Sequence, residues 1–530
     1  MTTATQPRGF QGDLLWQKGQ ASLGRNDVGG ARNVLTAYQV LGRGNDTHAH
    51  LLASQIAWHE DRVRDSTAEA LEAARIAPDD AETLNAVVGV LLDIGENLAA
   101  RECLARLSLE GCDDPLLLTG LATMHKRLEQ HAESMLLLDQ AKALGNVNPA
   151  LRYARGRALI VRGRIDEAEE ELAKTLAEAP DRGTVAVPLV RLRRQTPERN
   201  WLPAIESGIR TAGIAPDEQA AFEFARYATL EDLGRHDEAW QALARGNALM
   251  RAHLPDETPH LPAWLDRFLP AVAAAQPRGA QEPMEGPVPI FIIGIPRSGT
   301  TLLERMLGNH TQVTAAGELM DFRQQFLWSA DTSNIFGEKF LTRVAGLDYA
   351  GLGRRYLLQT QWRAHGTPFY IDKNPPNWMF AGPIHAALPR APILNLVRDP
   401  VDTCFSNWRV FFGNTCGYSY DLAAMAAYFR TYQRTLEHWH RVMPGAILDV
   451  NYTDLVSDPD RILRQAFDFC GLGWEPGCAD LARNQSPSAT PSAAQVRGPL
   501  RTDRGNLWRP YQAQLAPLLQ ALGTGATDPA

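Results

Sequence analysis

The pattern of apolar and polar positions divides the chain into two regions. Up to about Pro255 the pattern is helical and rich in Ala, Leu, Glu and Arg, whereas from Val288 onward short apolar runs alternate with amphipathic segments. The first pattern predicts an α-helical domain over residues 1–255, and the alternation predicts an α/β domain over 288–530 with a mainly parallel sheet. The Pro-rich residues 256–287 are the predicted linker. The expected strands are VPIFIIGI (288–295), PFYIDK (368–373), APILNLVRD (391–399) and GAILDVNY (445–452).

The helical region contains three similar segments, LDIGENLAA (92–100), IVRGRIDEA (160–168) and LEDLGRHDEA (230–239). In each, a Gly is followed five residues later by an Ala, and a weaker copy places Ala132 between the first two. The Ala spacings of 32, 36 and 71 indicate a period of roughly 34 residues, which resembles the tetratricopeptide repeat of paired helices. Gly would end the first helix of a pair, and the small Ala would let the second pack closely. The prediction is an α-helical solenoid. The alternative is an irregular helical domain with chance spacings, and the first ~60 residues fit the repeat poorly.

Composition narrows the possible functions. At 530 residues the chain is too long for one ordinary core, so two or three domains are expected. A formal net charge of −8 argues against a nucleic-acid binder held by general charge. The six cysteines have no metal-ligand spacing and are expected to be reduced. The sequence has no secretory signal pattern and no apolar run of the ~18 residues that a membrane span needs, so a cytoplasmic protein is expected.

The stretch PIFIIGIPRSGTTLLERML, from Pro289 to Leu307, is the most informative of the chain. An apolar strand leads into a Gly, Pro, Ser and Thr turn that opens directly into a helical pattern, which is the order of a phosphate-binding loop. Gly294 and Gly299 have P-loop spacing, but Thr300 stands where a nucleotide kinase carries Lys. Arg297 supplies the positive charge from within the loop. The segment therefore predicts a site for a phosphate-like group that is not built like an ATPase.

Three further segments make the pattern specific: GEL (317–319), DKNPPNW (372–378) and LNLVRDPVDTCFSNW (394–408). Together with the loop, the constellation resembles the sulfotransferases that use 3′-phosphoadenosine-5′-phosphosulfate (PAPS), in particular the bacterial tetratricopeptide-repeat sulfotransferases and the tyrosylprotein sulfotransferases. The resemblance covers Val288 to about Trp508. It implies an enzyme that moves a sulfuryl group from PAPS to an acceptor hydroxyl without a metal. The acceptor would be a protein, peptide, glycan or small molecule, and the repeats could hold a protein partner.

The resemblance also implies which residues bind the donor. The residues expected around the 5′-phosphosulfate are Arg297, Ser298, Gly299, Thr300 and Thr301, through backbone N–H groups, the helix N-terminus and the arginine. Arg398 and Ser406 match the family's pair for the 3′-phosphate, and Tyr452 matches its nucleotide-contacting tyrosine. The alternatives are a solvated loop arginine at Arg297 and a sheet-edge tyrosine at Tyr452.

Three residues match catalytic positions of the family. Glu318 would be the general base that takes the acceptor's proton, and Lys373 would neutralise charge on the bridging oxygen. Ser492 aligns with a serine near the same oxygen. The alternatives are a first-turn acid at Glu318 and, at Lys373, a pair with Asp372 or a solvated strand end.

The chain departs from the tyrosylprotein enzymes in places. Leu507 stands before Trp508 where those enzymes have a basic residue, and Arg497, Arg501 or Arg504 could substitute for it. His310 and the other helical histidines are expected to be structural. The rival functions are a P-loop kinase or NTPase and a repeat scaffold with a nucleotide-sensing domain.

Overall fold

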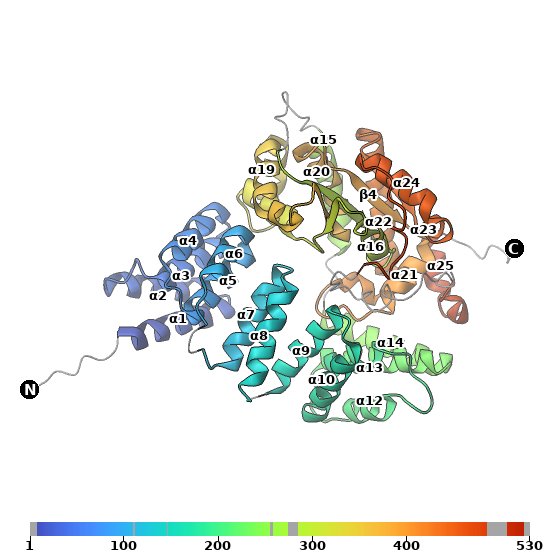
Figure 1. Ribbon diagram of the computed structural model, residues 1–530, viewed down its shortest axis with the longest axis horizontal. Coiled ribbons are helices and arrows are strands. Elements are labelled where there is room, and N and C mark those ends of the chain that lie inside the picture. Colours follow the sequence, from blue (N-terminus) through green and yellow to red (C-terminus); the bar gives the residue numbers. More distant parts are fainter. Residues whose placement is uncertain are drawn as a thin grey trace, which may run out of the picture. The chain divides into compact units, whose positions relative to one another are not determined.

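A computed structural model describes residues 8–109, 112–145, 147–254, 258–273, 285–484 and 506–523. A helical N-terminal region is followed by a parallel sheet with its covering helices, as the sequence predicted (Figure 1). The helices before the sheet are α1 (Arg8–Gly24), α2 (Val28–Val40), α3 (Thr47–His59), α4 (Val63–Ile76), α5 (Ala81–Ile94), α6 (Asn97–Arg106), α7 (Pro115–Arg127), α8 (His131–Ala143), α9 (Pro149–Val161), α10 (Ile165–Glu178), α11 (Gly183–Arg191), α12 (Leu202–Ile209), α13 (Pro216–Asp232), α14 (His236–His253), η1 (Thr258–His260) and α15 (Leu261–Ala273).

A left-handed residue lies in the turn of six of the helix pairs in this described region. These residues are Asn26, Asp61, Gly95, Glu129, Gly163 and Gly234. They are 34 or 35 positions apart up to Gly163, and the last follows after 71. The residue five positions later is small and buried in every pair: Ala31, Ser66, Ala100, Ser134, Ala168 and Ala239. The 34-residue periodicity of the sequence is therefore a periodicity of the structure, while its assignment to the tetratricopeptide family stays a prediction.

Two details of the repeat differ from the sequence interpretation. Ala132 is exposed, and Ser134 is the small residue that packs, with its hydroxyl donating to the Ala122 carbonyl at 2.7 Å. The start of the chain, which fits the pattern poorly in sequence, has the same turns at Asn26 and Asp61, where these residues take the left-handed conformation that glycine takes elsewhere.

The contacts within the chain define two units. The first contains Met1–Leu144 and Met320–Thr360, and the second contains Gly145–Leu319 and Gln361–Ala530. The predicted domain limits at 255 and 288 follow the order of elements along the chain and remain predictions.

In the first unit, the segment from Met320 to Thr360 packs on the helical repeats. It carries α17 (Asp321–Ala330), α18 (Glu338–Arg343), η2 (Val344–Gly346) and α19 (Tyr349–Thr360). Asn97 at the start of α6 donates to the Asp321 carboxylate at 2.7 Å, and Gln325 donates to the Gly95 carbonyl at 2.8 Å. Buried Glu96 pairs with Arg355, and burial raises the pKa of the Glu96 carboxyl although Arg355 opposes the shift.

In the second unit, five strands form one sheet in the order β2-β3-β1-β4-β5. The strands are β1 (Val288–Gly294), β2 (Val313–Ala315), β3 (Phe369–Lys373), β4 (Ile393–Val397) and β5 (Ile447–Asn451), and every pair is parallel. The register places Ile292 opposite Lys373 and Val397 opposite Asn451. The four predicted strands and their parallel arrangement are confirmed. The sequence analysis missed β2, because three residues are too short to show an alternating pattern.

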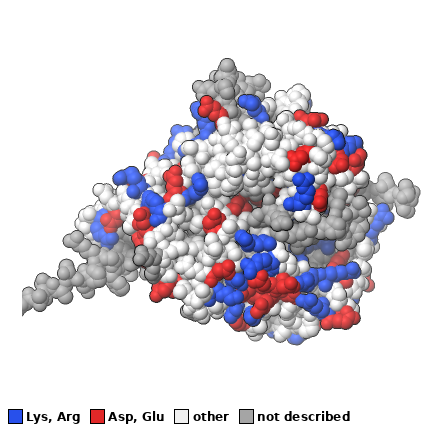
Figure 2. Space-filling model, viewed as in Figure 1, with Lys and Arg blue, Asp and Glu red and all other residues white. Residues whose placement is uncertain are grey.

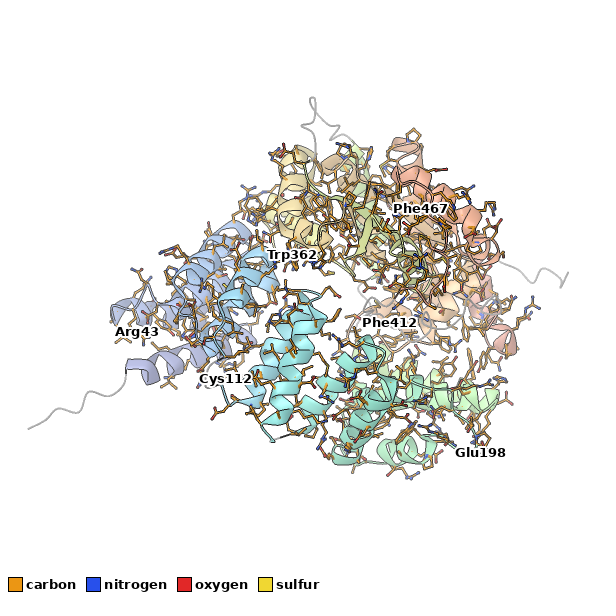
Figure 3. The ribbon with its side chains drawn as sticks, in the orientation of Figure 1. Arg43, Cys112, Glu198, Trp362, Phe412 and Phe467 are labelled. Atoms are coloured by element: carbon orange, nitrogen blue, oxygen red, sulfur yellow. The ribbon has the colours of Figure 1, made fainter. Side chains whose placement is uncertain are left out.

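Helices cover both faces of this sheet. The remaining elements are α16 (Thr300–Leu307), η3 (Gln361–Ala364), η4 (Pro375–Phe380), α20 (Ala381–Ala387), α21 (Pro400–Trp408), η5 (Gly417–Tyr420), α22 (Leu422–Val442), α23 (Tyr452–Ser457), α24 (Pro459–Cys470), η7 (Arg509–Tyr511) and α25 (Ala516–Leu522). Leu394 and Leu396 point to the face that α16 and α24 cover, where Phe467 is fully buried (Figure 3). Asn395 between them points to the other face and accepts a hydrogen bond of 2.7 Å from Tyr432 of α22.

The surface charges are mixed in sign. On the face shown in Figure 2, basic and acidic side chains interleave over α10 to α14, with pairs such as Arg199–Glu169 at 2.7 Å and Arg235–Glu238 at 2.6 Å. Each exposed pair contributes about 0–1 kcal/mol, but together the pairs prevent a field of one sign over these helices. Among the described residues, no helix has the length and apolar character that crossing a membrane requires.

Candidate functional site

The candidate residues follow the carboxyl ends of the five strands of the second unit. The loop with Arg297 follows β1, Glu318 follows β2, Lys373 ends β3, Arg398 follows β4, and Tyr452 follows β5. Because all five strands are parallel, their carboxyl ends lie at one edge of the sheet, where ligands bind in open α/β folds. Residues separated by more than 150 positions in sequence are thus collected at one edge.

The loop between β1 and α16 has the backbone of an anion cradle. Arg297 has a φ of 69° and Gly299 a φ of 111°, both in the left-handed region. Alternation of such residues turns successive N–H groups toward one point, and α16 adds its positive N-terminus at Thr300, where the N-cap residue is Gly299 and therefore offers no capping side chain. A non-glycine residue at positive φ costs about 1–3 kcal/mol and is typical of ligand-binding loops.

Two residues of the loop, Ser298 and Gly299, bear on whether a phosphosulfate fits. Ser298 is 1% exposed, and its hydroxyl has no hydrogen-bond partner among the described residues. A Cβ built on Gly299 would lie 2.5 Å from Cδ2 of Tyr452, so only glycine lets the ring pack against the loop. A hydroxyl without a described partner, the N–H groups of a helix N-terminus and an arginine are the kinds of donor that an oxyanion needs.

Arg398 connects the cradle to the far half of the sheet. Its Nη1 donates to the Arg297 carbonyl at 3.3 Å, and its guanidinium carbon lies 4.6 Å from the centre of the Tyr452 ring. Asn407 of α21 donates to the Pro296 carbonyl at 2.7 Å and so ties the same loop to that helix. The structure therefore brings four of the predicted donor-site positions together: Arg297, Gly299, Arg398 and Tyr452.

Asp402, which the sequence analysis did not single out, faces Arg398. Its carboxylate lies 3.7 Å from an Nη of Arg398 and accepts a hydrogen bond of 2.9 Å from the Asn506 N–H. Burial raises the pKa of the Asp402 carboxyl, against the opposing charge of Arg398. Ser406 is half-buried in the second turn of α21, four residues after Asp402 and on the same helical face. The spacing from Arg398 to Asp402 is the signal that could have revealed this acid.

Hydrogen bonds to β3 hold the segment that carries Glu318. The Ala316 N–H donates to the Ile371 carbonyl and the Lys373 N–H to the Gly317 carbonyl, both at 3.0 Å. The Asn374 amide donates to the Leu319 carbonyl at 2.7 Å. Because the segment is held on both sides of Glu318, its carboxylate is brought directly onto the Lys373 ammonium as an ion pair.

The two members of this ion pair differ in exposure. The Lys373 side chain is fully buried, whereas 47% of the Glu318 side chain is exposed. A third charged group comes from α16, where Oε2 of Glu304 lies 3.8 Å from Nζ of Lys373 and the side chain is 9% exposed. The sequence analysis missed Glu304, although an acid on the buried, mainly apolar helix TTLLERML was a possible signal.

A cysteine and stacked tyrosines lie beside this group. Burial raises the pKa of the Cys416 thiol, and the negative charge of Glu318 adds to the shift. Next to it, Tyr418 stacks on Tyr428 with ring centres 3.8 Å apart. Both effects favour the neutral thiol over the thiolate.

The remaining candidates are His310, Ser492 and the arginines that could replace a basic residue before Trp508. His310 donates through Nε2 to the Gly473 carbonyl at 2.9 Å and accepts from the Gln312 N–H at 3.1 Å, so both ring nitrogens have structural partners. Ser492 lies outside the described residues, as do Arg497, Arg501 and Arg504. No group of three or more His, Cys, Asp and Glu residues in the described ranges is arranged to hold a metal ion.

Comparison with known proteins identifies the α/β region. Residues 289–476 match the sulfotransferase family. The chain contains a sulfotransferase domain. The match begins in β1 and ends just after α24, so all strands of the sheet and their following loops lie within it.

Three similar proteins illustrate the range of relatives. An uncharacterized protein of Aquifex aeolicus is 26% identical over 398 residues, which are 68% of this chain and 49% of that protein. The nodulation protein NoeE of Sinorhizobium fredii is 31% identical over 127 residues, 22% of this chain and 30% of NoeE. The sulfotransferase domain of the Synechococcus PCC 7002 olefin synthase superposes with a TM-score of 0.33 and 23% identity, covering 48% of this chain and 100% of that domain. This chain thus spans about half the length of the Aquifex protein and under a third of NoeE.

Proposed function

We propose that the protein transfers a sulfuryl group from PAPS to a hydroxyl of an acceptor. The observation that supports this best is the arrangement at one sheet edge of an anion cradle, an arginine stacked on a tyrosine, and a carboxylate paired with a buried lysine. An anion cradle alone would suit many phosphate ligands. The added acid–base pair suits group transfer to a hydroxyl.

The donor would be held across the centre of the sheet. The loop residues Arg297 to Thr301 would hold the 5′-phosphosulfate through N–H groups, the Ser298 hydroxyl and the Arg297 guanidinium. Arg398, with Ser406 on the following helix, would hold the 3′-phosphate. Tyr452 supports the Arg398 guanidinium and closes the glycine side of the loop.

PAPS, when bound, supplies a sulfuryl group joined to a phosphate through a bridging oxygen. Glu318 would accept the proton of the acceptor hydroxyl as the new bond from oxygen to sulfur forms. The bond from sulfur to the bridging oxygen breaks, and the electron pair stays on the departing phosphate. Lys373 and the N–H groups of the cradle would meet that negative charge, which costs little reorganisation because they are already fixed in place. The role of Ser492 near the same oxygen rests on the family resemblance alone.

This chemistry requires that the acceptor carry a hydroxyl group. The partly exposed Glu318 needs an acceptor that can bring a hydroxyl to the sheet edge. We propose a hydroxyl-bearing protein, peptide, glycan or small molecule, with the paired helices of the N-terminal region as a possible holding surface for a protein partner.

Calorimetric titration with 3′-phosphoadenosine 5′-phosphate tests the donor site, with ATP and AMP as controls, on the wild type and on Arg398→Ala. Selective binding of the bisphosphate by the wild type and its loss in Arg398→Ala are the expected results. Transfer of labelled sulfuryl from PAPS to a panel of the four acceptor classes then tests the reaction. Equal or stronger binding of ATP with Mg²⁺ would overturn the proposal in favour of a kinase or NTPase.

A further inference from the structure

The buried carboxylate of Glu304 has no role in the proposed function so far. It lies on α16, four residues after Thr300, with 7% of the residue exposed. Its Oε2 is 3.8 Å from Nζ of Lys373, within ion-pair range but beyond hydrogen-bond length. A buried carboxylate loses its hydration, and a nearby positive charge offsets that cost.

The Lys373 ammonium therefore faces two carboxylates of unequal accessibility. Glu318, from the loop after β2, is 47% exposed along its side chain, and Glu304, from α16, is 9% exposed. Of the two carboxylates, Glu318 presents far more of its side chain to solvent, so it is the one placed to meet an acceptor hydroxyl. This fits Glu318 as the proposed base and leaves Glu304 as a fixed charge 3.8 Å from the lysine.

A second negative charge near Lys373 becomes necessary during the reaction. When Glu318 takes up the proton of the acceptor, its carboxylate becomes neutral and the ion pair with Lys373 loses its negative member. A fully buried ammonium without a charged partner is strongly disfavoured. The loss of that partner would come as charge grows on the bridging oxygen, which is when the positive charge is needed.

We propose that Glu304 is a positioning residue that keeps Lys373 charged and directed at the bridging oxygen while Glu318 is protonated. This inference rests on the proposed function. In this scheme the exposed Glu318 takes up the proton, and the buried Glu304 keeps Lys373 charged. Glu304 touches neither the acceptor nor the donor in this scheme, and acts only through Lys373.

The test compares Glu304→Gln and Glu304→Asp with the wild type, measuring kcat and KM for PAPS, the affinity for 3′-phosphoadenosine 5′-phosphate by calorimetry, and the melting temperature. Gln keeps the size of the side chain and removes its charge, whereas Asp restores the charge at a longer distance. Glu475→Gln is the matched control, because Glu475 is a carboxylate that accepts hydrogen bonds of 2.8 Å from Thr311, outside the site.

We expect kcat of Glu304→Gln to fall about 10–100-fold, by analogy with the loss of a residue that positions a metal ligand. The bisphosphate affinity and KM should change by less than about threefold, since the donor's own contacts remain. Glu304→Asp should recover part of kcat, and Glu475→Gln should keep all of it. If Glu304→Gln does not fold, Glu304→Asp is the test. A lower kcat with nearly unchanged bisphosphate affinity in that variant would support the proposal.

Two results would overturn the inference. One is a wild-type kcat in Glu304→Gln. The other is a parallel loss of kcat, bisphosphate affinity and melting temperature, which would make Glu304 a structural charge only. Glu318→Gln in the same series separates this failure from that of the proposed function. If the wild type transfers sulfuryl and Glu318→Gln does not, the proposed function stands whatever Glu304 does, and if the wild type neither binds the bisphosphate nor transfers sulfuryl, both proposals fall.

Discussion

Substitution of Gly299 by alanine tests whether the loop after β1 is shaped by the packing of Tyr452. A Cβ at this position would lie 2.5 Å from Cδ2 and 2.9 Å from Cε2 of Tyr452, and 3.1 Å from Cδ2 of Leu396. Carbon atoms pack at about 3.5–4.0 Å, so the ring or the loop has to move by about 1 Å. The φ of 111° adds backbone strain, because L-residues rarely adopt it.

The expected cost follows from these two effects. A residue in so sparsely populated a backbone conformation costs about 1–3 kcal/mol, so the free energy of unfolding of Gly299→Ala should fall by that amount. A displacement of about 1 Å in a site can lower turnover about 100-fold. The affinity for 3′-phosphoadenosine 5′-phosphate should also fall, since Arg398 stacks on the displaced ring at 4.6 Å.

The assays are urea unfolding for stability and calorimetric titration for binding. Gly473→Ala is the matched control, since a Cβ there meets no atom within 4 Å and the residue has no positive φ. If Gly299→Ala keeps both the stability and the bisphosphate affinity of the wild type, the reasoning that links Tyr452, Gly299 and Arg398 is refuted.

Three other changes have expected outcomes. Glu318→Gln should lower kcat about 10²–10⁴-fold, as loss of a general base does, with bisphosphate affinity retained in calorimetry; substantial turnover would exclude Glu318 as the base. Asn97→Ala should lower the free energy of unfolding in urea by about 1–3 kcal/mol, because it leaves the buried Asp321 carboxylate without its 2.7 Å donor; unchanged stability would contradict this. Hydrogen bonds from Thr311 lower the pKa of the Glu475 carboxyl below its usual 4.5, so its stabilisation is present above pH 4.5 and is lost as pH falls further. The stability difference between the wild type and Glu475→Gln should therefore shrink on acidification from pH 6 to pH 3, and a constant difference would contradict it.

The parts of the fold that could be predicted are those with a long, local signal. The four strands of five to seven residues are mostly apolar and are bounded by turns, and all four were predicted. The three residues of β2 carry too little pattern. The repeat was found where Gly forms the turn and was missed at Asn26 and Asp61, because the left-handed conformation leaves a clear mark in the sequence only when glycine provides it.

The candidate site divides in the same way. Glu318, Lys373, Arg398 and Tyr452 could be named as candidates because each belongs to a recognisable motif at or just after the end of a strand. Glu304 was missed because its role depends on a partner 69 residues away in the sequence, and only the pairing of β3 with β1 brings the two together. Contacts of this kind are made by tertiary structure, and no local pattern in one sequence encodes them.

The strand order places the candidate residues in two groups, one on each side of the loop after β1. The chain runs from β1 outward to β2, returns through β3, and then crosses to the other side of β1 for β4 and β5. The acid and the lysine consequently lie on the β2–β3 side of the loop, and the arginine and tyrosine lie on the β4–β5 side. In the proposed function, a ligand held by the central loop would therefore have Glu318 and Lys373 on one side and Arg398 and Tyr452 on the other. That asymmetry suits a donor whose two charged ends differ, with one reacting and the other only held, and it predicts that substitutions on the β4–β5 side weaken donor binding while those on the β2–β3 side slow transfer.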